Sequence, residues 1–357
     1  MTHKKKPLIR WTLIILLCAL LAAGSYFGIR YYRIVLATSH TPDHTAGEWI
    51  DLAPEGIVSA NGTPVTSRMR LGAENGKVIV LFYGGGVSVD EYTASHPYTT
   101  TDFFNENGFY LPDTVGVIPE LCDAGIGSLQ RDNPFRDWTL IIIPYTTADY
   151  HIGTAEYTYT DAAGEEKTLY HHGYINYRAL MDEAVSYVDG DVDTLLIAGS
   201  SAGGFGAAML AEELIGEYFP SAENITVCID SALQLWDNWK ETARDIWGAP
   251  EALTEKMVST DLIVDFLADL YNTCGDRVTF LYVGSVRDGA LARYQSYFHE
   301  GTFRVNNRQG RMYAGDLEKM VSQLRESVPT IGIYLFDSLP YSIRPESNSQ
   351  LTRQTVK

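Results

Sequence analysis

The feature that most constrains the fold is a serine in a glycine-rich segment between a strand pattern and a helix pattern. Residues 194–198 form an apolar run, Gly199-Ser200-Ser201-Ala202-Gly203-Gly204 follows it, and residues 205–218 have helix-like spacing. Small residues two places before and after Ser201 permit a tight strand-to-helix turn that exposes the hydroxyl group as a nucleophile. The alternative is a glycine-rich connection that binds a phosphate or nothing. The segment lacks the lysine of a phosphate-binding loop. The context favours a nucleophile elbow.

The rest of the chain alternates between strand-like and helix-like segments. Strand-like runs occur at residues 77–83, 138–144, 194–198, 225–229, 277–283 and 330–336, with two edge strands expected at 48–52 and 68–73. Helix-like stretches occur at residues 174–188, 205–218, 260–271 and 315–328. Strands that are apolar at nearly every position are typical of a parallel sheet covered on both faces. The predicted fold class is α/β, with a doubly wound, mostly parallel sheet of the α/β-hydrolase type.

The N-terminus has the pattern of a membrane anchor. Three lysines and Arg10 precede an uncharged apolar run at residues 11–29, which two arginines follow. A helix over this run would be about 28 Å long, close to the ~30 Å thickness of a bilayer core. Most of the positive charge precedes the span, so we expect a cytoplasmic N-terminus and an extracytoplasmic body. The alternative is a signal peptide cleaved near residue 24, which would give a secreted protein.

These patterns divide the chain into four parts. They are a cytoplasmic tip with a transmembrane anchor (1–33), a polar tether (34–47), one α/β-hydrolase domain (48–345) and a tail expected to be disordered (346–357). About 300 residues are many for one domain but suit a single sheet with insertions.

Charge and cysteine usage exclude several classes of function. Residues 34–357 contain 21 Lys and Arg against 45 Asp and Glu, a net charge of −24, so nucleic-acid binding is not expected. Cys122, Cys228 and Cys274 have no metal-ligand spacing, and one disulfide between two of them stays open. The sequence predicts neither a metal site nor a cofactor, because it contains no ligand cluster and no dinucleotide-binding pattern.

A second glycine run, Gly84-Gly85-Gly86, directly follows the strand pattern at residues 77–83. Acyl-transfer enzymes aim backbone N–H groups at the oxyanion that develops during the reaction, and glycines allow the chain to approach closely. In hydrolases with a nucleophile elbow, one N–H comes from such a loop and one from the residue after the nucleophile. We therefore expect Gly85 or Gly86, together with Ala202, to form an oxyanion hole.

The order of these motifs resembles the pectin acetylesterase and Notum-like family from about residue 78 to residue 343. The shared features are the glycine loop, Asn133-Pro134-Phe135, Asp149-Tyr150-His151-Ile152-Gly153, His172-Gly173-Tyr174-Ile175-Asn176, the elbow and Asp230-Ser231. The resemblance implies a Ser-His-Asp triad that removes acyl groups from carbohydrate or lipidated substrates. It assigns Ser201 as the nucleophile and Asp288, just after the strand at 277–283, as the acid that orients the imidazole.

The sequence departs from the family at the histidine. Tyr341 stands where the family has its catalytic histidine, and no histidine follows His299. A phenol with a pKa of about 10 is a poor general base near neutral pH. Three interpretations stay open: His299 supplies the base, His151 or His172 from an earlier loop supplies it, or the triad is incomplete.

Two hypotheses of function follow from these residues. The first is an extracytoplasmic serine esterase that removes acyl groups, acetyl above all, from a carbohydrate through an acyl-enzyme at Ser201. The acidic body argues against a long anionic pectin chain as its partner. The second is a catalytically impaired surface protein that kept the hydrolase fold and binds a glycan or a protein.

Overall fold

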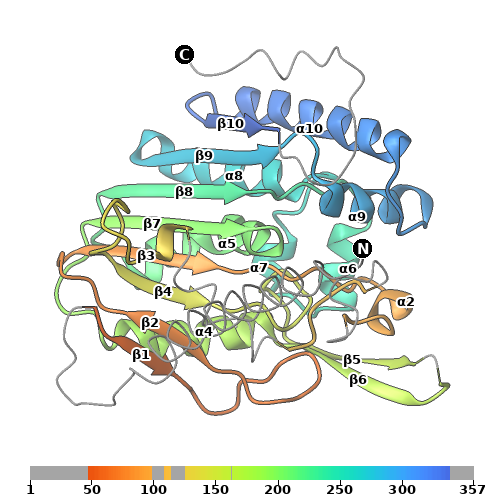
Figure 1. Cartoon of the computed structure of the whole chain (residues 1–357), viewed down its shortest axis with the longest axis horizontal. Helices are drawn as coiled ribbons and strands as arrows, with labels where there is room; N and C mark the ends of the chain where they lie inside the picture. The colour runs from red at the N-terminus through yellow and green to blue at the C-terminus, as the bar shows by residue number, and fades with distance from the viewer. Residues whose placement is uncertain (1–46, 99–107, 114–124, 162, 338–357) are drawn as a thin grey trace, which may run out of the picture.

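A computed structural model describes residues 47–98, 108–113, 125–161 and 163–337. Its main sheet has the strand order β1-β2-β4-β3-β7-β8-β9-β10 (Figure 1). The bounds are β1 (Trp49–Leu52), β2 (Ser67–Arg70), β3 (Lys77–Phe82), β4 (Thr139–Ile143), β7 (Thr194–Ser200), β8 (Asn224–Asp230), β9 (Val278–Ser285) and β10 (Gly332–Phe336). Strand β2 is antiparallel to β1 and β4, and the pairs from β4 to β10 are parallel. The predicted mostly parallel sheet is confirmed.

Helices and a separate hairpin complete the described domain. The helices are α2 (Glu91–Ala94), α4 (Gly173–Val185), α5 (Ala202–Glu213), α6 (Trp239–Asp245), α7 (Glu251–Thr254), α8 (Leu262–Cys274), α9 (Gly289–Glu300) and α10 (Asn307–Ser327). Two short 3-10 helices are η2 (Gly125–Gly127) and η4 (Gly275–Arg277), and η3 (Leu214–Tyr218) is a π-helix that continues α5. Strands β5 (Ala155–Thr160) and β6 (Glu166–His171) pair as an antiparallel hairpin outside the main sheet.

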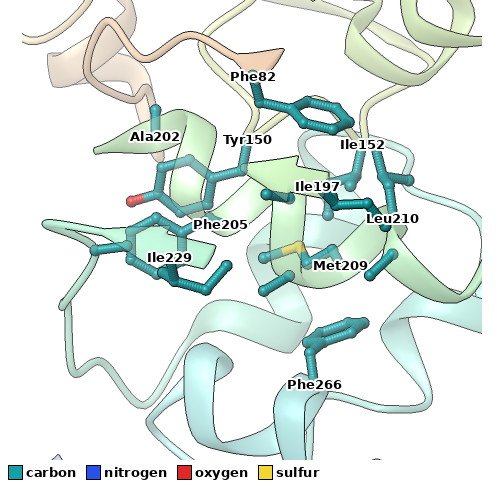
Figure 2. Packing of buried hydrophobic residues seen from close by; sticks show 14 of the residues in the cluster. Phe82, Tyr150, Ile152, Ile197, Ala202, Phe205, Met209, Leu210, Ile229 and Phe266 are labelled. Atoms are coloured by element: carbon teal, nitrogen blue, oxygen red, sulfur yellow. The ribbon is translucent and has the colours of Figure 1, made fainter. Parts of the chain in front are cut away.

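The two faces of the sheet bury alternate residues of the same strands. Helices α4, α5 and α8 lie behind the sheet in Figure 1, and α10 packs on α8 and α9. Figure 2 shows the core on this side, where Phe82, Ile197 and Ile229 from the strands meet Met209 of α5 and Phe266 of α8. A smaller apolar cluster of Trp49, Ile79, Leu140, Ile142, Leu196 and Ala198 occupies the other face.

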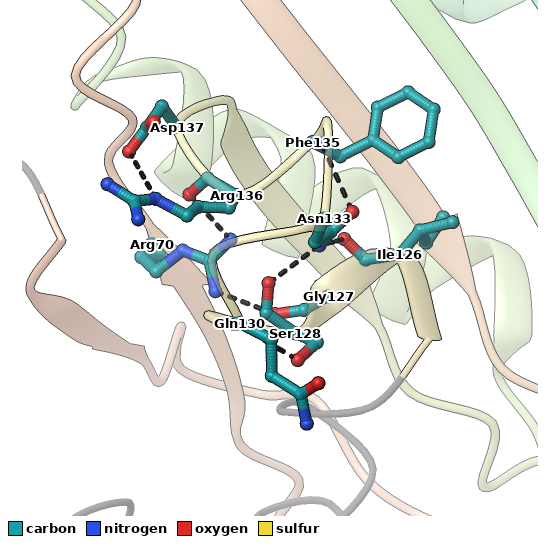
Figure 3. Close-up of polar contacts among 9 residues, drawn as sticks. All are labelled: Arg70, Ile126, Gly127, Ser128, Gln130, Asn133, Phe135, Arg136 and Asp137. Carbon is teal, nitrogen blue, oxygen red and sulfur yellow. Dashed lines mark hydrogen bonds and ion pairs between the residues drawn. The ribbon is translucent and has the colours of Figure 1, made fainter.

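Residues 125–137 cover part of this second face and are held by polar contacts (Figure 3). The buried Arg70 of β2 donates from Nη1 to the Gly127 carbonyl at 2.7 Å. Asn133 donates from Nδ2 to the Ile126 carbonyl and accepts from the Phe135 amide. The side chains of Arg70 and Asn133 therefore satisfy backbone groups of this irregular segment that are not paired in a helix or a strand.

The predicted anchor, the Tyr341 position, the tail and Cys122 lie outside the described residues. Within the described ranges, no helix is long and apolar enough to cross a membrane. Cys228 and Cys274 are both free thiols. The described part of the chain contains no group of three His, Cys, Asp or Glu side chains arranged to hold a metal ion.

Candidate active site

Ser201 occupies the turn between β7 and α5 in a conformation that is rare for residues other than glycine. Its φ is 56° and its ψ is −126°. Such a backbone costs of order 1–3 kcal/mol and persists only where the surroundings enforce it. A β-carbon on Gly199 would lie 2.0 Å from the Gly203 carbonyl oxygen. The close approach of these two backbone segments therefore requires glycine at position 199. The predicted tight strand-to-helix turn is present around Ser201.

The elbow ends at the start of a helix. Ser201 donates its amide to the Asp230 carbonyl at 2.9 Å, which joins the turn to the end of β8. Ala202 is the first residue of α5, a position whose N–H has no partner within the helix. The amino end of a helix has a partial positive charge that stabilises a nearby anion. This position suits the predicted role of Ala202 as an oxyanion donor.

The glycine loop after β3 lies directly against the elbow. A β-carbon on Gly84 would lie 2.5 Å from the Ser200 carbonyl oxygen and 2.9 Å from the Ser201 β-carbon, so only glycine fits there. Gly86 has a φ of +85° and forms an isolated bridge with Tyr110. The structure therefore brings the run Gly84–Gly86 together with Ser201. The sequence prediction named Gly85 and Gly86 and missed the contact at Gly84, although the triple glycine run contains it.

Asp288 follows β9 and is the N-cap of α9. Its Oδ1 accepts the Leu291 amide at 2.9 Å. Burial raises the pKa of this carboxyl, backbone hydrogen bonds lower it, and the nearby Asp230 carboxylate raises it further. Strand β8 separates the strand ends that lead to Asp288 and Ser201, a lateral distance of about 10 Å. Ser201 and Asp288 therefore follow strands that are separated by one strand at the same edge of the sheet.

His299 does not lie in that gap. It is in the last turn of α9, eleven residues after Asp288, which is about 16 Å along a helix axis. Its Nε2 lies 3.9 Å from Oδ2 of Asp316 on α10. The structure therefore places the His299 ring at the end of α9 away from Asp288 and does not bring it together with Ser201.

Of the other two candidate histidines, His151 has a hydrogen-bond partner and the buried Nδ1 of His172 has none. His151 is fully buried, and its Nε2 donates to the Tyr83 carbonyl at 2.9 Å, so this nitrogen holds the proton. Burial lowers the pKa of His151 to about 4. His172 is the N-cap of α4, and its ring contacts Tyr170 edge-on at 5.4 Å. Burial also lowers the pKa of His172.

The described chain ends just short of the position that the family gives to histidine. Strand β10 ends at Phe336, whose carbonyl accepts the Val286 amide at 2.9 Å. Asp337 then pairs with Arg287, the neighbour of Asp288. The chain therefore leaves the sheet beside the acid. Tyr341 itself lies outside the described residues.

Two crystal structures of the Wnt deacylase Notum from Drosophila are similar to this chain. The first has a TM-score of 0.52 at 18% sequence identity and the second a TM-score of 0.53 at 17%. Each comparison covers 82% of this chain and 84% of the Notum chain. No protein-family model and no curated protein matches the sequence. The predicted resemblance to Notum-like proteins is confirmed at the level of the α/β-hydrolase fold.

Proposed function

We propose that this chain is a serine esterase that removes an acyl group, acetyl above all, from a carbohydrate or another alcohol. The observation that carries the proposal is the strained backbone of Ser201 packed against Gly84. The deacylase activity named for the Notum structures belongs to the same class of reaction. Strained backbone of this kind clusters at functional sites, where the surrounding structure enforces it.

The reaction would proceed in two acyl-transfer steps. Ser201 Oγ attacks the ester carbonyl, its proton passes to a base, and the carbonyl oxygen becomes an oxyanion. Backbone N–H groups of Ala202 and of the glycine loop stabilise that oxyanion, and each such donor is worth about 10²- to 10³-fold in kcat. The alcohol then leaves with a proton. Water next hydrolyses the acyl-enzyme and releases the carboxylic acid.

Asp288 is the acid in this proposal, and the identity of the base decides how active the enzyme is. Among the described residues, none of the three histidines forms a hydrogen bond with Ser201 or Asp288. His151 donates to the Tyr83 carbonyl, His299 lies beside Asp316, and His172 Nδ1 is buried with no hydrogen-bond partner. This observation favours the second candidate, a hydrolase-fold protein that binds a glycan or a protein partner without turnover.

One experiment separates the two candidates. The purified full-length chain would be treated with a fluorophosphonate probe and, separately, with an acetyl ester, beside Ser201→Ala. We expect covalent labelling that disappears in Ser201→Ala and turnover that falls in this variant to a residual rate. A folded chain that is not labelled, with residual turnover equal in both proteins, would refute the esterase proposal in favour of binding. Oxyanion stabilisation and binding alone leave a catalysis of about 10³- to 10⁴-fold over water when a triad member is removed.

Two further variants identify the base once labelling is found. We expect His299→Gln to be labelled at the rate of the original chain, because its ring faces α10. Tyr341→His tests whether the family's histidine increases the rate. A loss of labelling in His299→Gln would restore His299 as the base.

We also propose that residues 11–29 anchor the chain with its body outside the cytoplasm, on the grounds of the charge asymmetry around the run. Protease added to intact cells would then degrade the body, and mass spectrometry of the purified protein would find an uncleaved N-terminus. Protection from protease in intact cells would refute this orientation.

A further inference from the structure

A fully buried loop at residues 145–153, which we call the support loop, has a strained backbone. It follows β4, and all nine of its residues are buried. Ala148, Tyr150 and His151 have φ values of 59°, 54° and 69°. Left-handed backbone costs roughly 1–2 kcal/mol for each residue that is not glycine. Other contacts must therefore hold this loop in place.

The carboxylate of Asp149 holds the support loop from within. It accepts the Thr147 hydroxyl at 2.7 Å, the His151 amide at 3.1 Å and the Gly173 amide at 2.8 Å. Gly173 begins α4, so the carboxylate also lies at the positive end of a helix. Burial raises the pKa of Asp149 to about 6, and these hydrogen bonds limit the rise. The loop is thus organised around one carboxyl side chain that accepts hydrogen bonds at both oxygens.

The support loop is bonded to both ends of the glycine loop. His151 Nε2 donates to the carbonyl of Tyr83, immediately before Gly84. The Ser88 amide, two residues after Gly86, donates to the Ala148 carbonyl at 2.9 Å. The run Gly84–Gly86 is therefore attached to the same buried loop on either side.

The support loop also contacts the elbow helix. A β-carbon on Gly206 of α5 would lie 2.5 Å from Cδ2 of His151, so ring and helix are in close contact. Tyr150 stacks on Phe205 of α5 with ring centroids 4.3 Å apart and planes at 8° (Figure 2). One loop thus contacts both the helix that begins after Ser201 and the glycine loop packed against it.

We propose that the support loop sets the position of the glycine loop relative to Ser201, with His151 and Asp149 as positioning residues for acyl transfer. His151 acts through the Tyr83 carbonyl and not as a base. Asp149 acts by fixing the backbone of residues 147–151. This inference rests on the proposed esterase function and extends it to residues that touch neither the substrate nor the reacting atoms.

Three variants in the full-length chain test the inference. His151→Phe keeps a ring and removes the donor to Tyr83, whereas His151→Gln keeps an N–H donor. Thr147→Val removes one donor to Asp149 at nearly constant volume and is the second test if His151→Phe does not fold. Met320→Ala removes a fully buried side chain from α10 and is the control for a general loss of stability.

Two measurements are made on each variant: amide hydrogen exchange at residues 84–88 and the rate of fluorophosphonate labelling at Ser201. In His151→Phe and Thr147→Val we expect exchange at residues 84–88 to be about tenfold faster, the effect of one lost hydrogen bond. Labelling should slow by about ten- to a hundredfold, because displacement of catalytic groups by about 1 Å can cost a hundredfold. His151→Gln should restore both values, and Met320→Ala should change neither.

Each possible failure has its own meaning. Exchange at residues 84–88 that is unchanged in folded His151→Phe or Thr147→Val overturns the inference. Labelling that falls equally in Met320→Ala overturns it as well, because the effect would then reflect stability alone. Absence of labelling in the original chain overturns the proposed function. The exchange measurement would still test the contact between the support loop and the glycine loop.

Discussion

At the scale of single residues, close backbone approach explains why the elbow motif could be read from the sequence. Gly199 and Gly203 stand two residues before and after Ser201, and a β-carbon on Gly199 would collide with the Gly203 carbonyl. This constraint is local, so the sequence pattern reveals it. The general base cannot be predicted in this way, because its identity depends on which histidine ring nitrogens already have hydrogen-bond partners. The His151 bond to Tyr83 joins residues 68 positions apart, and no local pattern encodes it.

Substitution of Gly84 tests the contact between the glycine loop and the elbow. In Gly84→Ala the new β-carbon would lie 2.8 Å from the Ala202 nitrogen and 2.9 Å from the Ser201 β-carbon, so the loop must move away. We expect labelling of Ser201 to fall by at least about a hundredfold, the value of one oxyanion donor.

The control for this substitution is Gly315→Ala in the interior of α10, where a β-carbon meets nothing within 4 Å. It should leave labelling unchanged and stabilise the chain by about 0.5–1 kcal/mol in urea denaturation. Equal labelling of Gly84→Ala and the original chain would contradict the close packing of the two segments.

At the scale of elements, the strands of the main sheet could be predicted from their apolar runs, and most of what surrounds the site could not. Helix α9 was missed because its apolar residues are interrupted and its start is marked only by the Asp288 cap. The β5–β6 hairpin was missed because β5 alternates half-buried and exposed residues, including Tyr157 and Tyr159, with no apolar run. These elements pack through tertiary contacts that a single strand or helix pattern does not record.

Asp288 has two roles that substitution can separate. Asparagine caps helices as well as aspartate does, so Asp288→Asn should change the free energy of unfolding by less than about 0.5 kcal/mol, whereas Asp288→Ala should lower it by about 1 kcal/mol. Both variants should lose the acid and turn over the acetyl ester much more slowly than the original chain.

Asp261 provides a matched control, because it is also a buried N-cap and its Oδ1 accepts the Ile263 and Val264 amides of α8. Asp261→Asn should retain full turnover. If Asp288→Asn is as active as Asp261→Asn, then Asp288 is only a helix cap.

At the scale of the whole molecule, the fold buries titratable groups whose pKa values shift in opposite directions. Burial lowers the pKa of His171 to about 3, although its hydrogen bond to the Thr147 carbonyl raises it. Burial raises the pKa of Asp261 to about 7, against the effect of its bonds to the α8 backbone. Their contributions to stability therefore change in opposite directions as the pH falls, and the total pH dependence of unfolding would hide both.

Single variants reveal each contribution, and their signs follow from linkage. His171 takes up a proton in the unfolded chain near pH 6.5 but not in the folded chain, so the stability it contributes is lost as the pH falls from 7 to 5. Asp261 takes up its proton in the folded chain first, so its contribution is present at pH 5 and is lost as the pH rises through about 7.

Urea denaturation at pH 5, 6 and 7 would compare the original chain with His171→Asn and Asp261→Asn. From pH 7 to pH 5, we expect the stability advantage of the original chain over His171→Asn to shrink by about 2 kcal/mol, and its advantage over Asp261→Asn to grow by a similar amount. Parallel changes in the two differences would mean that at least one of these side chains is not buried in the form described.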